Sequence, residues 1–170
     1  MSDPQTQLEE ALEAWRYARQ GFIDEAANIP PDDWGFRPTP ENRDVGELVR
    51  HIIESGLMAV GELTHPDGDF TRQSFPDHIR EHAGSLPESA DRDRWLALLR
   101  ETLEDGLRRY RSAGEALMMR PITQFNGEPA RRLTWFHHSV AHEEYHRGQL
   151  ALYARLTGHV PALTQRIRGG

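Results

Sequence analysis

The stretch HHSVAHEEYHRGQLALYARLTGHVPAL, residues 137–163, combines a histidine pattern with a clear helix end. Three histidines recur in it every four residues, so they lie on one side of a helix. They are His138, His142 and His146. Gly158 and Pro161 follow the last apolar residues, an order typical of a helix C-terminus. The stretch therefore predicts a helix over about residues 131–157, with the histidines on the face expected to point inward.

Three further segments show the 3.6-residue period of amphipathic helices, and no segment shows sustained two-residue alternation. They cover about residues 3–28, 44–63 and 91–119. The first stops before Pro30 and Pro31, which cannot continue a helix. Asp44 followed by Glu47 resembles a capping box at the start of the second. The chain is thus predicted to be all-α.

A connection of about 25 residues separates the second and third predicted helices, and adjacent antiparallel helices need far less. We therefore expect a four-helix bundle with a long crossover connection between helices 2 and 3, formed by residues 1–170 as one domain. His78 and His82, in this connection, share the four-residue spacing. No apolar stripe accompanies them, and metal sites need rigid support. They are predicted to be a surface pair.

The composition excludes several classes of function. The chain has no cysteine, and all 20 of its basic residues are arginine, so thiolate sites and catalytic lysines are absent. A net charge of −7 argues against nucleic-acid binding. The sequence shows neither a signal peptide nor an apolar run of membrane-spanning length. We expect a cytoplasmic protein with no membrane association, in which any metal is held by His, Asp or Glu.

The residues His142 to His146 read His-Glu-Glu-Tyr-His, the pattern of zinc proteases. Such a protease needs a third ligand farther along the chain. Leu152 stands six residues after the second histidine, and no acidic residue follows Glu144. Two imidazoles four residues apart can still converge on one ion. The pattern predicts a metal site whose third ligand comes from elsewhere in the chain.

The stretch over residues 137–163 resembles the last helix of the DinB superfamily of DinB/YfiT-like metalloenzymes. The family signature His-x-x-x-His-Arg-Gly-Gln matches residues 142–149, and a Leu-x-Gly-x-x-Pro-like tail follows. Upstream, FRPTPENRDVGELVRHIIESG is similar to the segment of the family that carries a leucine shortly before a histidine, here Leu48 and His51. The resemblance implies a four-helix bundle, frequent homodimers, and one divalent ion, Zn²⁺ or Ni²⁺. The implied ligands are His51, His142 and His146.

The resemblance also implies a metal-dependent enzyme acting on a small molecule, first of all an S-transferase that uses a low-molecular-weight thiol. A metal-dependent hydrolase and a non-catalytic metal-containing binding or stress-response protein are the alternatives. Gln149 and Glu47 are candidates to hydrogen-bond the ligating imidazoles, although Glu47 serves the capping box equally well. Glu143 is a candidate general base; the other interpretation is a solvated charge or an ion pair with Arg147.

Overall fold

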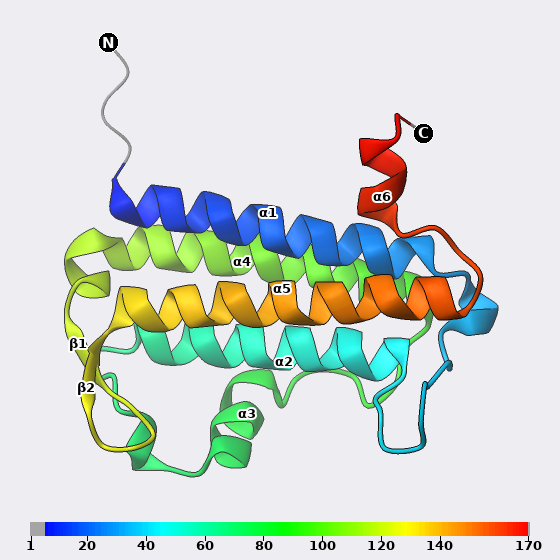
Figure 1. Cartoon of the computed structure of the whole chain (residues 1–170). Coiled ribbons are helices and arrows are strands. Elements are labelled where there is room, and N and C mark those ends of the chain that lie inside the picture. Colours follow the sequence, from blue (N-terminus) through cyan, green and yellow to red (C-terminus); the bar gives the residue numbers. More distant parts are fainter. Residues whose placement is uncertain (1–5, 170) are drawn as a thin grey trace.

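The computed structural model describes residues 6–169 and confirms the all-α four-helix bundle (Figure 1). The four long helices are α1 (Gln7–Asn28), α2 (Val45–Thr64), α4 (Arg92–Met118) and α5 (Arg132–Leu156). The predicted start of the first helix, at residue 3, lies outside the described residues. The other predicted boundaries lie within one residue of those observed. The period of the apolar residues therefore located all four long helices.

Local capping explains where these helices begin and end. Asp44 accepts a hydrogen bond from the Glu47 amide while Glu47 accepts one from the Asp44 amide, which confirms the capping box of α2. The Asp91 side chain caps α4 by accepting a hydrogen bond from the Arg94 amide. At the end of α5, Gly158 has a φ of +85°, a conformation that favours glycine.

The bundle pairs parallel helices. Helix α1 packs against α5 and α4, and α2 packs against α4 and α5. Figure 1 shows α1 and α5 running in one direction and α2 and α4 in the other. Because α2 and α4 are parallel neighbours, the chain must return along the bundle between them. Residues 65–91 do so, which confirms the predicted crossover connection.

Several short elements were not predicted. The crossover contains the 3₁₀ turn η2 (Phe70–Arg72) and helix α3 (Phe75–Ala83), which packs on α2. A small antiparallel hairpin joins α4 to α5, with strands β1 (Pro121–Thr123) and β2 (Pro129–Arg131). The 3₁₀ turn η1 (Pro31–Asp33) follows α1, and α6 (Ala162–Ile167) follows α5. Gly114, with a φ of +82°, interrupts α4 near its end.

The core consists of two apolar clusters, one toward each end of the bundle. One contains Phe22, Ile52, Leu99 and Leu150, and the other contains Trp15, Val60, Leu107 and Phe136. Near the middle of the bundle each long helix contributes a polar side chain. These residues, here called the polar layer, are Arg19 from α1, His51 from α2, Thr102 from α4 and Glu143 from α5. The candidate site lies at this layer.

No helix within residues 6–169 combines the length and the apolar character that crossing a membrane would require.

Candidate metal centre

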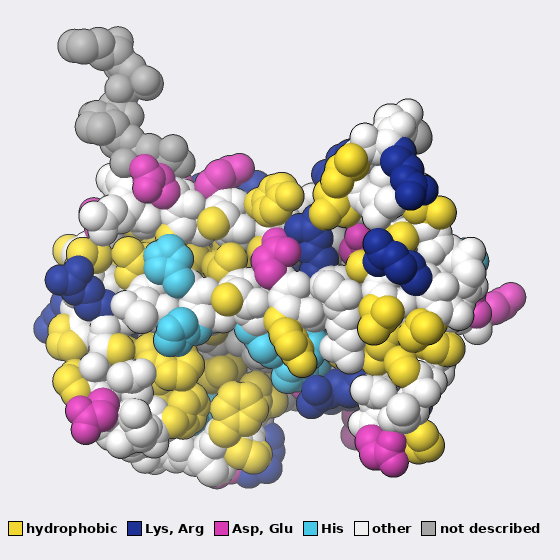
Figure 2. Space-filling model, in the orientation of Figure 1, with side chains coloured by type: hydrophobic (Ala, Val, Ile, Leu, Met, Phe, Trp, Pro, Cys, Tyr) yellow, Lys and Arg dark blue, Asp and Glu magenta, His cyan; other side chains and the backbone are white. Residues whose placement is uncertain are grey.

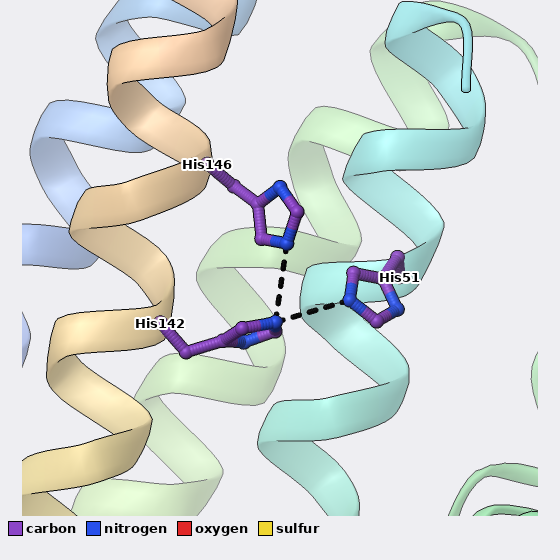
Figure 3. Close-up of side chains that lie close together, drawn as sticks. All are labelled: His51, His142 and His146. Carbon is purple, nitrogen blue, oxygen red and sulfur yellow. Dashed lines mark hydrogen bonds between the residues drawn. The ribbon is translucent and has the colours of Figure 1, made fainter. Parts of the chain in front are cut away.

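Three imidazoles from two helices converge at the polar layer (Figure 3). His51 comes from α2, and His142 and His146 come from successive turns of α5. The Nε2 atom of His142 lies 3.1 Å from the Nε2 of His51 and 3.1 Å from the Nε2 of His146. We call this group the three-histidine centre. The structure thus brings together the three residues that the family resemblance implied as ligands.

The arrangement fits a divalent ion. Zn²⁺ binds histidine nitrogen at about 2.0–2.1 Å, so nitrogens around a tetrahedral ion are about 3.3 Å apart, close to the observed 3.1 Å. Without an ion, three ring nitrogens face one another. A neutral imidazole carries one proton, so the His142 Nε2 can donate to only one of its two neighbours. A cation between the three nitrogens would accept all three lone pairs.

The surroundings keep the imidazoles neutral, which is the form that binds metal. Burial lowers the pKa of His51 to about 4, and the positive charge of Arg43 and of the other two histidines acts in the same direction. Burial also lowers the pKa of His142 and of His146; in His146 the hydrogen bond to the Gln149 oxygen acts in the opposite direction. All three rings are therefore uncharged at pH 7.

A chain of hydrogen bonds fixes the orientation of His146. Its Nδ1 lies 2.9 Å from the side-chain oxygen of Gln149. The Gln149 amide nitrogen donates to the Tyr153 hydroxyl at 2.9 Å, and this hydroxyl donates to the Arg43 carbonyl at 2.9 Å. The proton on His146 is thus held at Nδ1, so Nε2 points its lone pair into the centre. The contact between Gln149 and a ligating imidazole is the one expected from the sequence.

Glu47 does not support the centre. Its carboxylate accepts from the Asp44 amide at 2.9 Å and from Arg37 at 2.9 Å. Among residues 6–169, no hydrogen bond joins it to His51. The carboxylate is committed to the helix start and to the preceding loop, so of the two roles expected from the sequence only the capping box is found.

Glu143 is neither a solvated charge nor paired with Arg147, as the sequence had suggested. Its side chain is buried and accepts from Arg19 at 2.6 and 2.8 Å and from the Trp15 indole at 2.7 Å. Arg147 contacts Glu144 instead, at 3.0 Å. Because three donors already occupy the carboxylate, Glu143 is not placed to act as a general base. The pair with Arg19 joins α5 to α1 beside His142.

The buried face of α5 explains this correction. Phe136, Glu143 and Leu150 follow at seven-residue intervals and are all buried. At about 100° per residue, the middle of this face lies about 100° from His142. The three-histidine centre is therefore at the edge of the core, and His138, farther round the helix, is exposed. The sequence predicted that the histidine face points inward; the structure turns it to the edge of the buried face.

The prediction of a surface pair in the crossover is wrong. His78 is fully buried on α3, with Nδ1 3.0 Å from the Glu62 carboxylate and Nε2 3.0 Å from the Phe70 carbonyl. The Nε2 of His82 lies 2.7 Å from the same Glu62 oxygen. Arg72 contacts both Glu62 and Glu81. We call this group the Glu62 cluster; it holds α3 on α2.

The fold and the centre define a helical-bundle protein with a three-histidine metal-binding geometry. The sequence model of the DinB superfamily matches residues 14–150, so this chain belongs to the DinB superfamily. No curated protein matches the chain.

Solved structures share the fold at low sequence identity. YfiT from Bacillus subtilis, described as a probable metal-dependent hydrolase with an unusual four-helix bundle topology, superposes with a TM-score of 0.71 at 15% identity, over 93% of this chain and 91% of that one. The DinB-like protein YjoA from Bacillus subtilis superposes with a TM-score of 0.69 at 18% identity, over 89% of this chain and 93% of that one. A mycothiol-dependent maleylpyruvate isomerase superposes with a TM-score of 0.64 at 13% identity; the match covers 85% of this chain but only 61% of the isomerase. Of these three structures, the isomerase is thus described as an enzyme and YfiT as a probable one.

Proposed function

We propose that this protein is a metal-dependent enzyme that joins a low-molecular-weight thiol to a small electrophilic substrate. Its ion, Zn²⁺ or Ni²⁺, would be held by His51, His142 and His146. The observation that carries the proposal is the convergence of the three Nε2 atoms, with that of His142 3.1 Å from each of the other two, beside a cavity that reaches His51 and His142. A site with three protein ligands and an open side is typical of catalytic rather than structural metals.

One comparison favours thiol chemistry over other metal chemistry: one similar structure is a mycothiol-dependent isomerase. Because the chain has no cysteine, the sulfur nucleophile of such a reaction would have to come from a second molecule. When bound, the ion would supply Lewis acidity, which lowers the pKa of a thiol or of water beside it.

The residues of the chain orient the three ligating imidazoles and keep them uncharged. Gln149 holds the proton of His146 at Nδ1 through the contact at 2.9 Å. The Arg19–Glu143 pair fixes the turn of α5 that carries His142. Burial keeps the imidazoles neutral. We also propose that the protein is a homodimer, as the family resemblance implies.

The test uses protein purified without a histidine tag and loaded with Zn²⁺. Conjugation of mycothiol, bacillithiol, glutathione or cysteine to a halomethyl electrophile is measured before and after chelation. We expect metal-dependent turnover with at least one thiol, lost in His142→Ala. His137→Ala is the matched control, because this exposed neighbour lies outside the centre, and it should retain full activity.

The similarity to YfiT makes a metal-dependent hydrolase the second candidate. Ester or amide cleavage that needs the metal but no thiol would favour it and overturn thiol transfer. If neither reaction occurs although the metal is bound, the protein is a non-catalytic metal-binding member of the family and the proposal is wrong.

A further inference from the structure

A cavity opens beside the three-histidine centre. It has a volume of about 230 Å³, and His51 and His142 form part of its wall. In Figure 2 its mouth is a hollow below α5, bordered by hydrophobic side chains and by histidines. Residues of α1, α2, α4 and α5 and of the crossover contribute to the lining. A molecule in this cavity would therefore lie next to the open side of the centre.

Aromatic side chains dominate the walls of the cavity. They are Trp15, Phe70, Phe75, Tyr110, Trp135 and Phe136. Such walls present large apolar surfaces with edges and faces suited to another ring. An apolar cavity of about 150 Å³ in another protein is large enough to bind benzene. The volume here accommodates one ring with a short substituent.

Away from the proposed ion, the cavity offers little that would compensate a charged ligand. Glu143 is the only carboxylate of its lining, and Arg19 already neutralises it at 2.6 Å. No arginine belongs to the lining. Arginines gather instead in a separate recess on the other side of His51, which Arg37, Arg43 and Arg50 line. Since an unpaired charge is costly to bury, the cavity selects for an uncharged group.

One polar group of the lining lacks a partner. The indole N–H of Trp135 is buried and has no acceptor among the described residues. A buried donor without an acceptor is costly, and a ligand that carries an oxygen acceptor could remove this cost. Carbonyl or ether oxygen attached to the ring would serve.

From these observations we infer that the cavity binds an uncharged, ring-sized apolar part of the substrate, which bears an oxygen acceptor for the Trp135 indole. The inference rests on the proposed function for the claim that this ligand is a substrate. Its binding claim stands on the cavity alone. The two are tested separately.

Binding is measured by ligand-observed NMR on the metal-free protein, because a carboxylate could coordinate a bound zinc ion directly. Three small ligands of similar shape are compared. Ethylbenzene is apolar, acetophenone adds a carbonyl oxygen, and benzoate adds a charge. We expect acetophenone and ethylbenzene to bind and benzoate to bind at least about ten-fold more weakly. Equal binding of benzoate, or no binding of either neutral ring, would overturn the inference.

Two variants locate the binding. Ser139→Trp should fill the cavity from α5 and abolish binding, whereas Thr134→Trp, on an exposed position of the same helix outside the lining, should leave it unchanged. Trp135→Phe removes the N–H donor and leaves a smaller aromatic ring, so ethylbenzene serves as the control for the change in shape. The variant should weaken acetophenone binding by about three- to ten-fold more than ethylbenzene binding, the size of one hydrogen bond. If Ser139→Trp does not fold, the acetophenone-specific loss in Trp135→Phe still decides the question, and an equal loss for both ligands contradicts it.

Turnover separates the two proposals. With benzyl bromide or bromoacetate, a sulfur–carbon bond forms as the carbon–bromine bond breaks, bromide leaves and the thiol proton passes to buffer. We expect the ratio of the catalysed to the uncatalysed rate to be at least ten-fold higher for benzyl bromide than for bromoacetate. Ring binding without any turnover would refute the proposed function and keep the cavity inference. Turnover with no preference for the ring would refute the cavity inference and keep the function.

Discussion

The three-histidine centre and the Glu62 cluster are built from the same sequence pattern but differ in charge. Each takes two histidines four residues apart from one helix, His142 and His146 or His78 and His82, and one residue from α2. In the centre the α2 residue is neutral His51, and three lone pairs face one another. In the cluster it is the carboxylate of Glu62, which already accepts from the two histidines and contacts Arg72.

The difference shows that histidine spacing does not define a metal site by itself. In the Glu62 cluster the guanidinium of Arg72 supplies the positive charge that a metal would otherwise bring. In the three-histidine centre the three Nε2 atoms face one another, and the charge of Arg43 lowers the pKa of all three rings, which disfavours protonation there. The centre is therefore arranged for a cation that comes from outside, whereas in the cluster Arg72 already balances the charge of the Glu62 carboxylate.

The largest expected effect is on metal affinity. His142→Ala should weaken Zn²⁺ binding by more than about 100-fold, since even the loss of an outer hydrogen-bond partner costs about 10- to 100-fold. His82→Ala, the equivalent change in the Glu62 cluster, should alter affinity by less than about three-fold. Competition with a chromogenic chelator measures both constants. Equal losses in the two variants would remove the distinction between the two groups.

The free energy of unfolding should depend more on the Glu62 cluster than on the three-histidine centre. Glu62→Gln leaves the buried His78, the partly buried His82 and Arg72 without their carboxylate, and should lower the free energy of unfolding of the metal-free protein by about 3 kcal/mol. His51→Gln, which removes no charge, should lower it by less than about 1 kcal/mol. Urea unfolding gives both values. Glu54→Gln, in the more exposed pair with Arg50, is the control and should cost less than about 1 kcal/mol.

The hydrogen bonds around the three-histidine centre should have a smaller effect on metal affinity than the ligands themselves. Gln149→Ala removes the acceptor that holds the proton of His146 at Nδ1, and should weaken Zn²⁺ binding by about ten-fold. Tyr153→Phe, one bond farther from the ring, should weaken it by less than about three-fold. Calorimetric titration distinguishes these values. Unchanged affinity in Gln149→Ala would show that the contact does not orient the imidazole.

The smallest expected effect is the pH dependence of stability. Burial alone would raise the pKa of Glu62, but hydrogen bonds from His82, Arg72 and His78 outweigh it, and the pKa is lowered. A lowered pKa stabilises the fold above the unfolded-state value of about 4.3, and the contribution is lost as the pH falls from there through the lowered folded-state pKa. The stability difference between the wild type and Glu62→Gln should thus shrink as the pH falls below about 4.3. A constant difference would contradict this assignment; Glu88→Gln, an exposed position, should follow the wild type throughout.

The sequence predicted what depends on local periodicity. The four long helices and the caps at Asp44 and Gly158 were found because they follow from spacing and from residue type. Helix α3 was missed because its inward face carries His78 rather than an apolar residue. The hairpin was missed because its strands are three residues long, although Asn126-Gly127 is a strong turn signal.

The buried pair of Arg19 and Glu143 was missed because its members are 124 residues apart. A signal existed on each helix. Arg19 stands four residues after Trp15 and three before Phe22, on the apolar stripe of α1, and Glu143 occupies the same kind of position on α5. Two opposite charges on two predicted core faces could have been paired, because buried charges need partners.

Anomalous diffraction at the zinc edge, on crystals of untagged protein soaked in Zn²⁺, tests the central claim most directly. The account predicts one strong peak per chain, about 2.0–2.1 Å from the Nε2 atoms of His51, His142 and His146, and none at the Glu62 cluster. A peak between Glu62, His78 and His82, or no peak at the three-histidine centre, would contradict it.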